Sequence, residues 1–222
     1  MIVTIDGPAG AGKSTVARAL AKRLGFRFLD TGAMYRAVAL AAMRRGVPLE
    51  DAAALGALAS EIEIEFDGDR VLVDGEDVTE AIRASAVTAA VRHVADNLQV
   101  RGRLVELQRR MGRTGNIVTE GRDQGTVAFP DAECKIFLTA SPEERARRRV
   151  RDLQRRGERA SFEEVLAQQT RRDREDASRP VGRMVQAEDA IEVTTDGLSI
   201  EAVVDRLCEI VKQRMEQPSD ED

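Results

Sequence analysis

The sequence predicts an α/β fold in three layers, with a mostly parallel sheet covered by helices on both faces. Two observations carry this prediction. Short apolar segments alternate along the chain with longer segments whose apolar residues recur at helical spacing. A glycine-rich loop directly follows the first apolar segment and is itself followed by a helix. In such folds the active crevice lies at the carboxyl ends of the strands, so we expect this loop to form part of it.

The first elements have clear boundary residues. The β-branched run 2–5 predicts a buried strand, and residues 13–24 predict a helix that Gly25 ends. Two more helices are predicted over 33–45 and over about 51–60.

The apolar period changes after residue 60. Ile62, Ile64 and Phe66 alternate with acidic residues, and a second alternating run, 71–73, follows an Asp-Gly-Asp turn. This pattern predicts a β-hairpin, and a long helix is predicted over about 87–111. Because the hairpin interrupts the alternation of strands and helices, we interpret this part of the chain as an insert.

The second half of the chain returns to alternating strands and helices. Ser141 and Pro142 predict a helix start, because a capping hydroxyl is followed by proline and then by two acids. The other predicted strands cover 116–119, 133–138 and 190–193, and the helices cover about 142–156, 161–178 and 199–214.

We expect one domain over residues 1–214. Its core would take residues 1–60, 112–140 and 180–214, with the insert at about 61–111. A lid is expected over about 141–179, where the sequence has 12 basic and 9 acidic residues. The acidic tail, 215–222, is predicted to be disordered because it is too polar to pack.

Composition excludes several classes of function. Aromatic residues make up 3% of the chain, there is no Trp, and the net charge is −5, all of which argue against nucleic-acid binding. No apolar run is long enough for a membrane span, and no signal peptide is evident, so we expect a cytoplasmic protein. Cys134 and Cys208 sit among apolar residues and predict buried, reduced thiols.

The glycine-rich loop fits the phosphate-binding pattern G-x-x-x-x-G-K-[ST] without a gap. Glycines let backbone N–H groups approach phosphates closely, and the following helix N-terminus adds partial positive charge. Lys13 would contact the β- and γ-phosphates of ATP, and the Ser14 hydroxyl would bind Mg²⁺. The predicted ATP-binding residues are Gly7, Pro8, Ala9, Gly10, Ala11, Gly12, Lys13, Ser14 and Thr15.

Two clusters are candidates for binding a phosphate acceptor. Thr31 and Arg36 stand about a turn and a half apart at a helix start and could clamp a monophosphate. They could equally be part of a capped helix with a solvated arginine. Arg122 and Asp123 follow a predicted strand, where the arginine could hold phosphate and the carboxylate could accept from an amino group. A structural salt bridge is the alternative there.

A third cluster lies near the end of the 161–178 helix. Arg172, Asp176 and Arg179 fall within about 60° of one another at helical spacing, so a carboxylate lies between two guanidiniums. This arrangement suits a ribose hydroxyl flanked by phosphates. The alternative is an exposed helix face with an Arg172–Asp176 pair of little energetic value.

Four segments together resemble the bacterial cytidylate kinase family. They read IDGPAGAGKST at 5–15, LDTGAMYR at 29–36, GRDQGTV at 121–127 with FPDA at 129–132, and RDREDASR at 172–179. The resemblance covers roughly residues 1–214. It implies a nucleoside monophosphate kinase fold with a core, a lid and an enlarged monophosphate-binding insert.

The resemblance also implies residue roles. It assigns the acceptor phosphate to Thr31, Arg36, Arg122 and Arg179, the ribose and the transferring phosphates to Asp176 and Arg172, and the cytosine edge to Asp123 and Arg101. Two positions depart from the family pattern. Arg92 stands where some members have a base-contacting serine, and Gln124 stands where an apolar residue is common.

The expected activity is phosphorylation of CMP and dCMP by ATP with Mg²⁺, in a monomer. Fixed cations would neutralise the negative charges of the donor and acceptor phosphates. The predicted catalytic residues are Lys13, Arg122, Arg172 and Arg179. The lone histidine, His93, is expected to have no catalytic role. Other readings are a kinase for another small acceptor, a nucleic-acid ATPase, a GTPase-like switch, or a nucleotide-binding module without turnover. The sequence has no Asn-Lys-x-Asp guanine reader for the switch.

Overall fold

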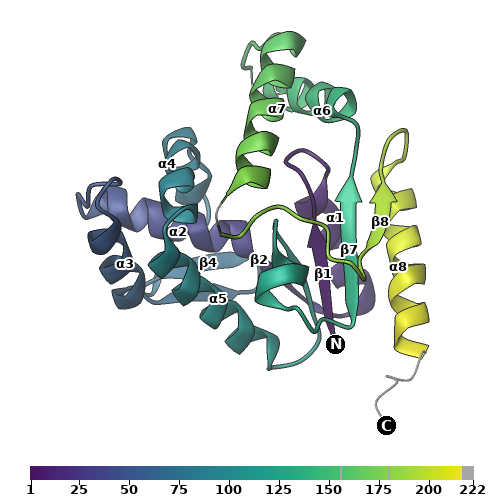
Figure 1. Ribbon diagram of the computed structural model, residues 1–222, viewed down its shortest axis with the longest axis horizontal. Helices are drawn as coiled ribbons and strands as arrows, with labels where there is room; N and C mark the ends of the chain where they lie inside the picture. Colours follow the sequence, from purple (N-terminus) through teal and green to yellow (C-terminus); the bar gives the residue numbers. More distant parts are fainter. Residues whose placement is uncertain (156, 180, 217–222) are drawn as a thin grey trace. The chain divides into compact units, whose positions relative to one another are not determined.

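The computed structural model describes residues 1–155, 157–179 and 181–216, in two compact units (Figure 1). The first unit combines residues 1–29 with the chain from 114 onward, and the second takes 30–113. The predicted insert began at about residue 61, but the second unit also includes the two helices before it. The last helix continues to Glu216, two residues into the predicted tail. The rest of that tail, 217–222, lies outside the described residues.

The first unit contains a five-stranded sheet in the order β2-β6-β1-β7-β8. The strands are β1 (Ile2–Asp6), β2 (Arg27–Asp30), β6 (Ile117–Glu120), β7 (Cys134–Thr139) and β8 (Ile191–Thr194). β1 pairs in parallel with β6 and β7, and β7 pairs in parallel with β8, which confirms the predicted parallel sheet. β2 is not among the predicted strands, because its four residues include a charge at each end and leave only two apolar positions to show a pattern.

Four helices accompany this sheet: α1 (Lys13–Leu24), α6 (Pro142–Arg155), α7 (Phe162–Ser178) and α8 (Ile200–Glu216). α1 and α8 pack against each other and bury the apolar side chains of Leu20 and Leu207 with those of the central strands. α6 begins just beyond β7, and α7 packs against it (Figure 1). Both expected thiols, Cys134 and Cys208, are buried and free.

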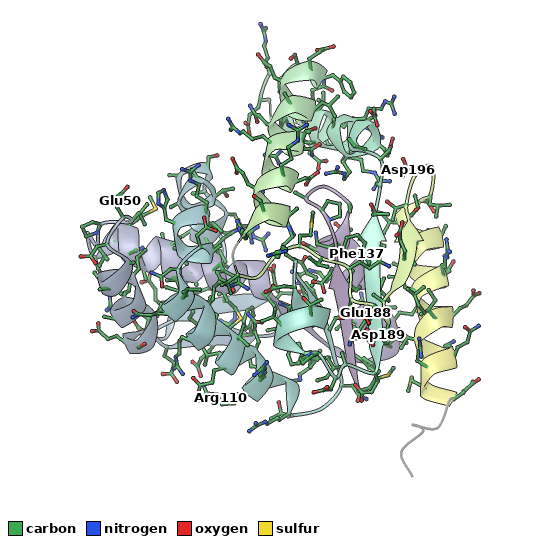
Figure 2. All side chains as sticks on the ribbon, in the orientation of Figure 1. Glu50, Arg110, Phe137, Glu188, Asp189 and Asp196 are labelled. Atoms are coloured by element: carbon green, nitrogen blue, oxygen red, sulfur yellow. The ribbon has the colours of Figure 1, made fainter. Side chains whose placement is uncertain are left out.

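The chain after β6 forms a short π-helical turn, Gln124–Ala128, that the sequence analysis did not predict. The carboxylate of Asp6 fixes this turn by accepting hydrogen bonds from the backbone N–H groups of Gln124 at 2.9 Å and Gly125 at 2.7 Å. The turn therefore depends on a residue far away in the sequence. Beyond β8, Asp196, labelled in Figure 2, accepts from the backbone N–H of Ser141 at 2.9 Å, which joins β8 to the start of α6.

The second unit contains four α-helices, a short 3₁₀ turn and a three-stranded antiparallel sheet in the order β3-β4-β5. Its elements are α2 (Thr31–Arg44), α3 (Ala52–Glu61), β3 (Ile64–Asp67), β4 (Arg70–Val73), β5 (Glu76–Asp77), a 3₁₀ turn (Ala81–Arg83), α4 (Ser85–Ala95) and α5 (Leu98–Gly112). The predicted hairpin is therefore present, with a third short strand added. α2 packs against α4 and α3 packs against α5, which explains why these helices belong to one unit.

The predicted continuous helix over 87–111 is wrong, because the chain forms α4 and α5 with a break between them. Asn97 starts the second helix by accepting from the backbone N–H groups of Gln99 and Val100. Its amide nitrogen donates to the carbonyl of Ala52 at 2.8 Å. The contact with Ala52 orients the amide so that its oxygen faces the first turn of α5, and apolar spacing alone could not reveal this cap. No helix in the described part of the chain has the length and apolar character needed to cross a membrane.

Candidate active site

The glycine-rich loop connects β1 to α1 and requires glycine at its first position. Gly7 has φ 141°, and a Cβ there would lie 2.0 Å from the carbonyl oxygen of Leu138 on β7. Gly12 has φ 91° and directly precedes α1 in a left-handed conformation. The loop can therefore curl beside the neighbouring strand and lead its backbone N–H groups into a helix N-terminus, the geometry that binds phosphates.

Lys13 is buried at the start of α1, with 5% of its surface exposed. Its Nζ donates to the carbonyl of Pro8 at 2.9 Å, across the loop. The pKa of Lys13 is lowered to about 7, first by burial and then by the positive charge of Arg122. The carboxylates of Glu120 and Asp6 oppose this shift. Burial and the neighbouring guanidinium of Arg122 thus disfavour the charge on Lys13, and an anionic ligand would stabilise that charge.

Ser14 follows Lys13 and points toward the end of β6. Its Oγ donates to Oε1 of Glu120 at 2.8 Å, and Glu120 itself is buried. A hydroxyl and a carboxylate are hard oxygen donors of the kind Mg²⁺ takes together with phosphate oxygens. The residues present therefore fit the ion expected at Ser14. Glu120 is not among the predicted site residues, although an acid at the carboxyl end of a central strand could have signalled it.

Asp176 is 2% exposed and contacts the charged side chains of two arginines. Its Oδ2 accepts from Nε of Arg122 at 2.8 Å, and its Oδ1 lies 3.0 Å from Nη2 of Arg179. The predicted alternative of an exposed helix face is therefore wrong, since the carboxylate is buried. Arg179 lies beside Asp176 as predicted, whereas Arg122, from the chain after β6, is a partner that helical spacing could not predict.

The other two members of the predicted set lie in the same unit. Arg172 is close enough for its charge to lower the pKa of Lys13. Asp123 is buried, and its charge raises the pKa of Asp6. The structural salt bridge considered as the alternative for this segment is present at Arg122, with Asp176 as the partner. The structure thus brings Lys13 and Arg122 together with the acidic residues around them.

The arginines of α6 divide into two sets. Arg145 and Arg148 turn toward the glycine loop, donating to the carbonyls of Ala9 at 3.0 Å and Ala11 at 3.4 Å. Arg147, Arg149, Arg151 and Arg155 are exposed. The sequence could not separate these sets because all six arginines occur within eleven residues of one helix.

Two predicted acceptor residues, Thr31 and Arg36, lie at the start of α2 in the second unit. Asp30 caps this helix by accepting from the backbone N–H of Ala33 at 2.9 Å, and Thr31 is buried behind it. Arg36 lies back over the first turn, where its Nη1 would be 3.1 Å from a Cβ added at Gly32. The structure shows the capped helix of the alternative interpretation, and it places Arg36 at the positive end of the helix dipole.

Arg101, expected to read the cytosine edge, lies on α5 and is 5% exposed. Its Nη1 donates to the carbonyl of Ala95 at 3.4 Å, and its guanidinium lies 5.9 Å from the ring centroid of Tyr35. Arg101 is thus fixed between α4 and α2. Arg92, the position that departs from the family pattern, is exposed on α4.

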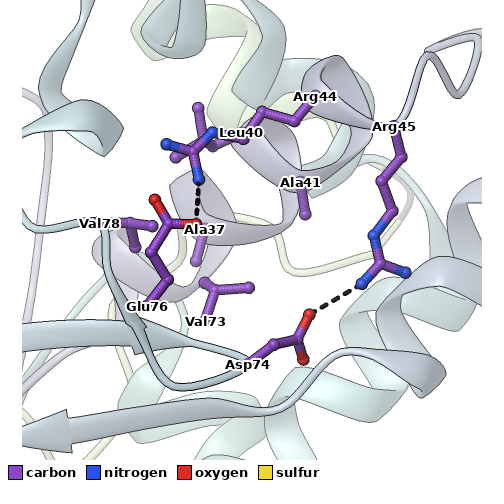
Figure 3. Close-up of a pocket in the computed structure, with 9 residues that line it drawn as sticks. All are labelled: Ala37, Leu40, Ala41, Arg44, Arg45, Val73, Asp74, Glu76 and Val78. Atoms are coloured by element: carbon purple, nitrogen blue, oxygen red, sulfur yellow. Dashed lines mark hydrogen bonds and ion pairs between the residues drawn. The ribbon is translucent and has the colours of Figure 1, made fainter.

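The second unit also contains a cavity of about 240 Å³ between α2 and the small sheet (Figure 3). Five apolar and four charged residues line it, and the charged ones form two ion pairs, Arg44 with Glu76 at 2.9 Å and Arg45 with Asp74 at 2.8 Å. None of the predicted site residues lines it. Since the charges at its rim are paired with one another, we assign this cavity no role.

The family model for cytidylate kinase matches residues 3–213 of the chain. A cytidylate kinase from Rhodopirellula baltica is 52% identical over 213 residues, covering 96% of this chain and 93% of that protein. A cytidylate kinase from Pelotomaculum thermopropionicum is 54% identical over 207 residues, covering 91% of this chain and 92% of that protein.

Solved structures show the same fold at lower similarity. A shikimate kinase from Bacteroides thetaiotaomicron superposes with a TM-score of 0.51 at 18% identity, over 96% of this chain and 98% of that chain. This likeness concerns the fold alone and agrees with the parallel sheet and the glycine loop. The relatives and the family model are far more specific, and they show that the chain belongs to the cytidylate kinase family.

Proposed function

We propose that this protein transfers the γ-phosphoryl group of ATP to CMP, and also to dCMP, giving ADP and the corresponding diphosphate. The observation that carries the proposal is the family match over residues 3–213. The geometry of the first unit supports it, because a phosphate loop, a buried lysine and several arginines converge there. We assign the protein to pyrimidine nucleotide metabolism on this basis.

Residues 7–15 would hold the phosphates of ATP. Their backbone N–H groups and the α1 N-terminus supply partial positive charge, and Lys13 supplies a full charge. Bound phosphates would raise the pKa of Lys13 and keep it protonated, since they offset the charge of Arg122. Mg²⁺, when bound with ATP, would neutralise phosphate charge, with the Ser14 hydroxyl as its expected ligand.

Arg122, Arg172 and Arg179 would stabilise charge on the transferring group. Phosphoryl transfer needs positioning and charge neutralisation more than covalent chemistry, so fixed cations are the main catalytic requirement. In the structure Asp176 holds Arg122 and Arg179 in place. We propose that it also accepts a hydrogen bond from the acceptor ribose while keeping these guanidiniums oriented.

Thr31 and Arg36 would bind the phosphate of CMP, and Arg101 and Asp123 would read its base. Arg36 provides a guanidinium at a helix start, where an anion is favoured. The guanidinium of Arg101 is already fixed beside Tyr35, which lowers the entropic cost of ordering it on a ligand. We further propose that α6 and α7 act as a lid that excludes water, and that the protein is a cytoplasmic monomer.

The test is a coupled assay with ATP and a panel of acceptors. We expect CMP to have the highest kcat/KM and dCMP to be a usable acceptor, with UMP and AMP below both. A higher kcat/KM with AMP or UMP than with both cytidine nucleotides would contradict the proposal. Light scattering on the purified chain, with and without nucleotides, tests whether it is a monomer.

A further inference from the structure

Arg145 is a buried cation that joins its own helix, α6, to three other elements of the first unit. It belongs to the first turn of α6 and is 4% exposed. Its Nε donates to the carbonyl of Ala140, and its Nη1 donates to the carbonyl of Ala9 at 3.0 Å. The same Nη1 lies 2.7 Å from Oδ2 of Asp173 on α7. One guanidinium therefore contacts the glycine loop, the end of β7 and both helices of the expected lid.

The counterion, Asp173, is unusual in its surroundings. Its side chain is 18% exposed, and its Oδ1 has no hydrogen-bond partner within the described chain. Burying a charge pair usually costs about as much in desolvation as the pair recovers, and an oxygen without a partner adds to that cost. Packing alone therefore gives no reason for this pair, and an apolar pair of similar volume would stabilise the helices as well.

The contact with Ala9 gives the pair a function. In a trans peptide the carbonyl and the N–H of the next residue point in opposite directions, so fixing one fixes the other. Arg145 holds the Ala9 carbonyl on its own side, and the N–H of Gly10 must therefore point away from α6. Lys13 acts on the preceding carbonyl of Pro8 at 2.9 Å. Two successive peptide groups of the loop are thus oriented by cationic donors.

The position of Gly10 is tightly restricted on the same side. A Cβ at Gly10 would lie 3.3 Å from Cβ of Arg145 and 2.9 Å from Nε2 of Gln169 on α7. Gln169 in turn donates to the backbone carbonyl of Arg145 at 3.4 Å. Because these side chains pack against the loop at Gly10, the peptide cannot turn over without displacing them.

We propose that Arg145, held by Asp173, is a positioning residue that orients the Ala9–Gly10 peptide for the phosphates of the nucleotide donor. This inference rests on the proposed function, because it takes the loop to bind those phosphates. The loop is preorganised by a salt bridge between the two helices behind it, so donor affinity depends on residues that do not touch the donor. The binding of the acceptor does not depend on this pair.

The experiment measures the dissociation constants of ADP and CMP by calorimetry for the full chain and three variants. Arg145→Met keeps the apolar stem and removes the donors, and Asp173→Asn keeps the shape and removes the counter-charge. Arg155→Met is the matched control, because it lies on the same helix, is exposed and pairs with Asp152 at 3.5 Å. Thermal unfolding of each variant is measured in parallel.

We expect Arg145→Met to weaken ADP binding about tenfold or more, the range for losing a hydrogen bond to a charged group, and to leave CMP binding unchanged. Asp173→Asn should weaken ADP binding in the same direction by less, and Arg155→Met should match the wild type. Wild-type ADP affinity in folded Arg145→Met overturns the proposal. If Arg145→Met does not fold, a wild-type ADP affinity in Asp173→Asn overturns the proposal. If the wild-type protein does not bind CMP, the proposed function is contradicted, but the ADP measurements still test the role of Arg145.

Discussion

In the unit that carries the glycine loop, three arginines of the candidate site and the expected lid pair with protein carboxylates. Arg122 and Arg179 both contact Asp176, and Arg145 contacts Asp173. In the unit of residues 30–113, all of which are described, Arg36 forms no ion pair with another member of that unit. Burial does not explain the difference, because Arg122, Arg179 and Arg36 are all partly exposed. It follows from where the fold places Asp176, whose buried carboxylate lies between the first two.

The two units differ in how their arginines are prepared for a phosphate. Paired arginines have fixed directions before any ligand arrives, but the ligand must compete with a carboxylate. An arginine without such a partner offers its full charge to the ligand, but its side chain must become ordered on binding. Substitutions of the paired arginines Arg122 and Arg179 should therefore affect stability and catalysis together, and substitutions of Arg36 should affect acceptor affinity alone.

The largest effect is expected for Lys13→Met in the first unit. Removing the charge aimed at the phosphates should reduce kcat by at least about 10²–10³-fold. The fold should remain intact, because a methionine fills the same space and avoids burying a charge. Steady-state kinetics and circular dichroism measure the two parts. Near wild-type activity, or an unfolded variant, would contradict the role given to Lys13.

Asp176→Asn tests whether the buried carboxylate contacts the acceptor. We expect kcat/KM with CMP to fall roughly 10–150-fold, the range for one hydrogen bond to a charged group. The loss should shrink for whichever of dCMP or arabinosyl-CMP lacks the hydroxyl that the carboxylate contacts. A loss of the same size on CMP, dCMP and arabinosyl-CMP would show that Asp176 only orients Arg122 and Arg179.

Asp6, in the first unit, predicts that the stability of the protein depends on pH. Its pKa is raised to about 6 by burial, against lowering by the N–H groups of Gly125 and Gln124, and its ordinary value is 3.8. Between these values the folded state binds more protons than the unfolded state, so this group makes the protein less stable as the pH rises from about 4 to 6.

The measurement is denaturant unfolding of wild type and Asp6→Asn between pH 4 and pH 7. Because asparagine does not titrate, the stability of the variant relative to the wild type should rise with pH across this range, by at most about 3 kcal/mol. Asparagine keeps only one of the two acceptor oxygens. The loss of the other lowers the stability of the variant by an amount that does not depend on pH. A stability difference that is constant from pH 4 to pH 7 would rule out the raised pKa.

The smallest effect is expected for Arg36→Met in the second unit. Loss of this cation should raise KM for CMP about tenfold. Both kcat and KM for ATP should stay near the wild-type values, since no protein carboxylate of its unit depends on Arg36. Thermal unfolding should be unchanged. Arg44→Met is the control on the same helix, since its pair with Glu76 is exposed and lies at the rim of the cavity. A lower melting temperature for Arg36→Met would contradict the comparison.

Local sequence determined much of this protein. The loop motif at 7–14 and the helix that follows it could be predicted because glycine, lysine and serine at that spacing have a local physical reason. The helix over 13–24, its end at Gly25 and the capped start of α7 at Ser161 also depend on neighbours in the chain. Four short segments together were specific enough to indicate the family.

Tertiary structure decided which charges meet. Asp176 pairs with Arg122 across 54 positions of sequence, Arg145 reaches Ala9 across 136, and Asp6 fixes a turn at 124–125. Helical periodicity could place arginines on α6, but it could not say which of them faces the loop. That choice depends on desolvation, because a guanidinium can be buried only where the folded chain brings a carboxylate or carbonyl to it.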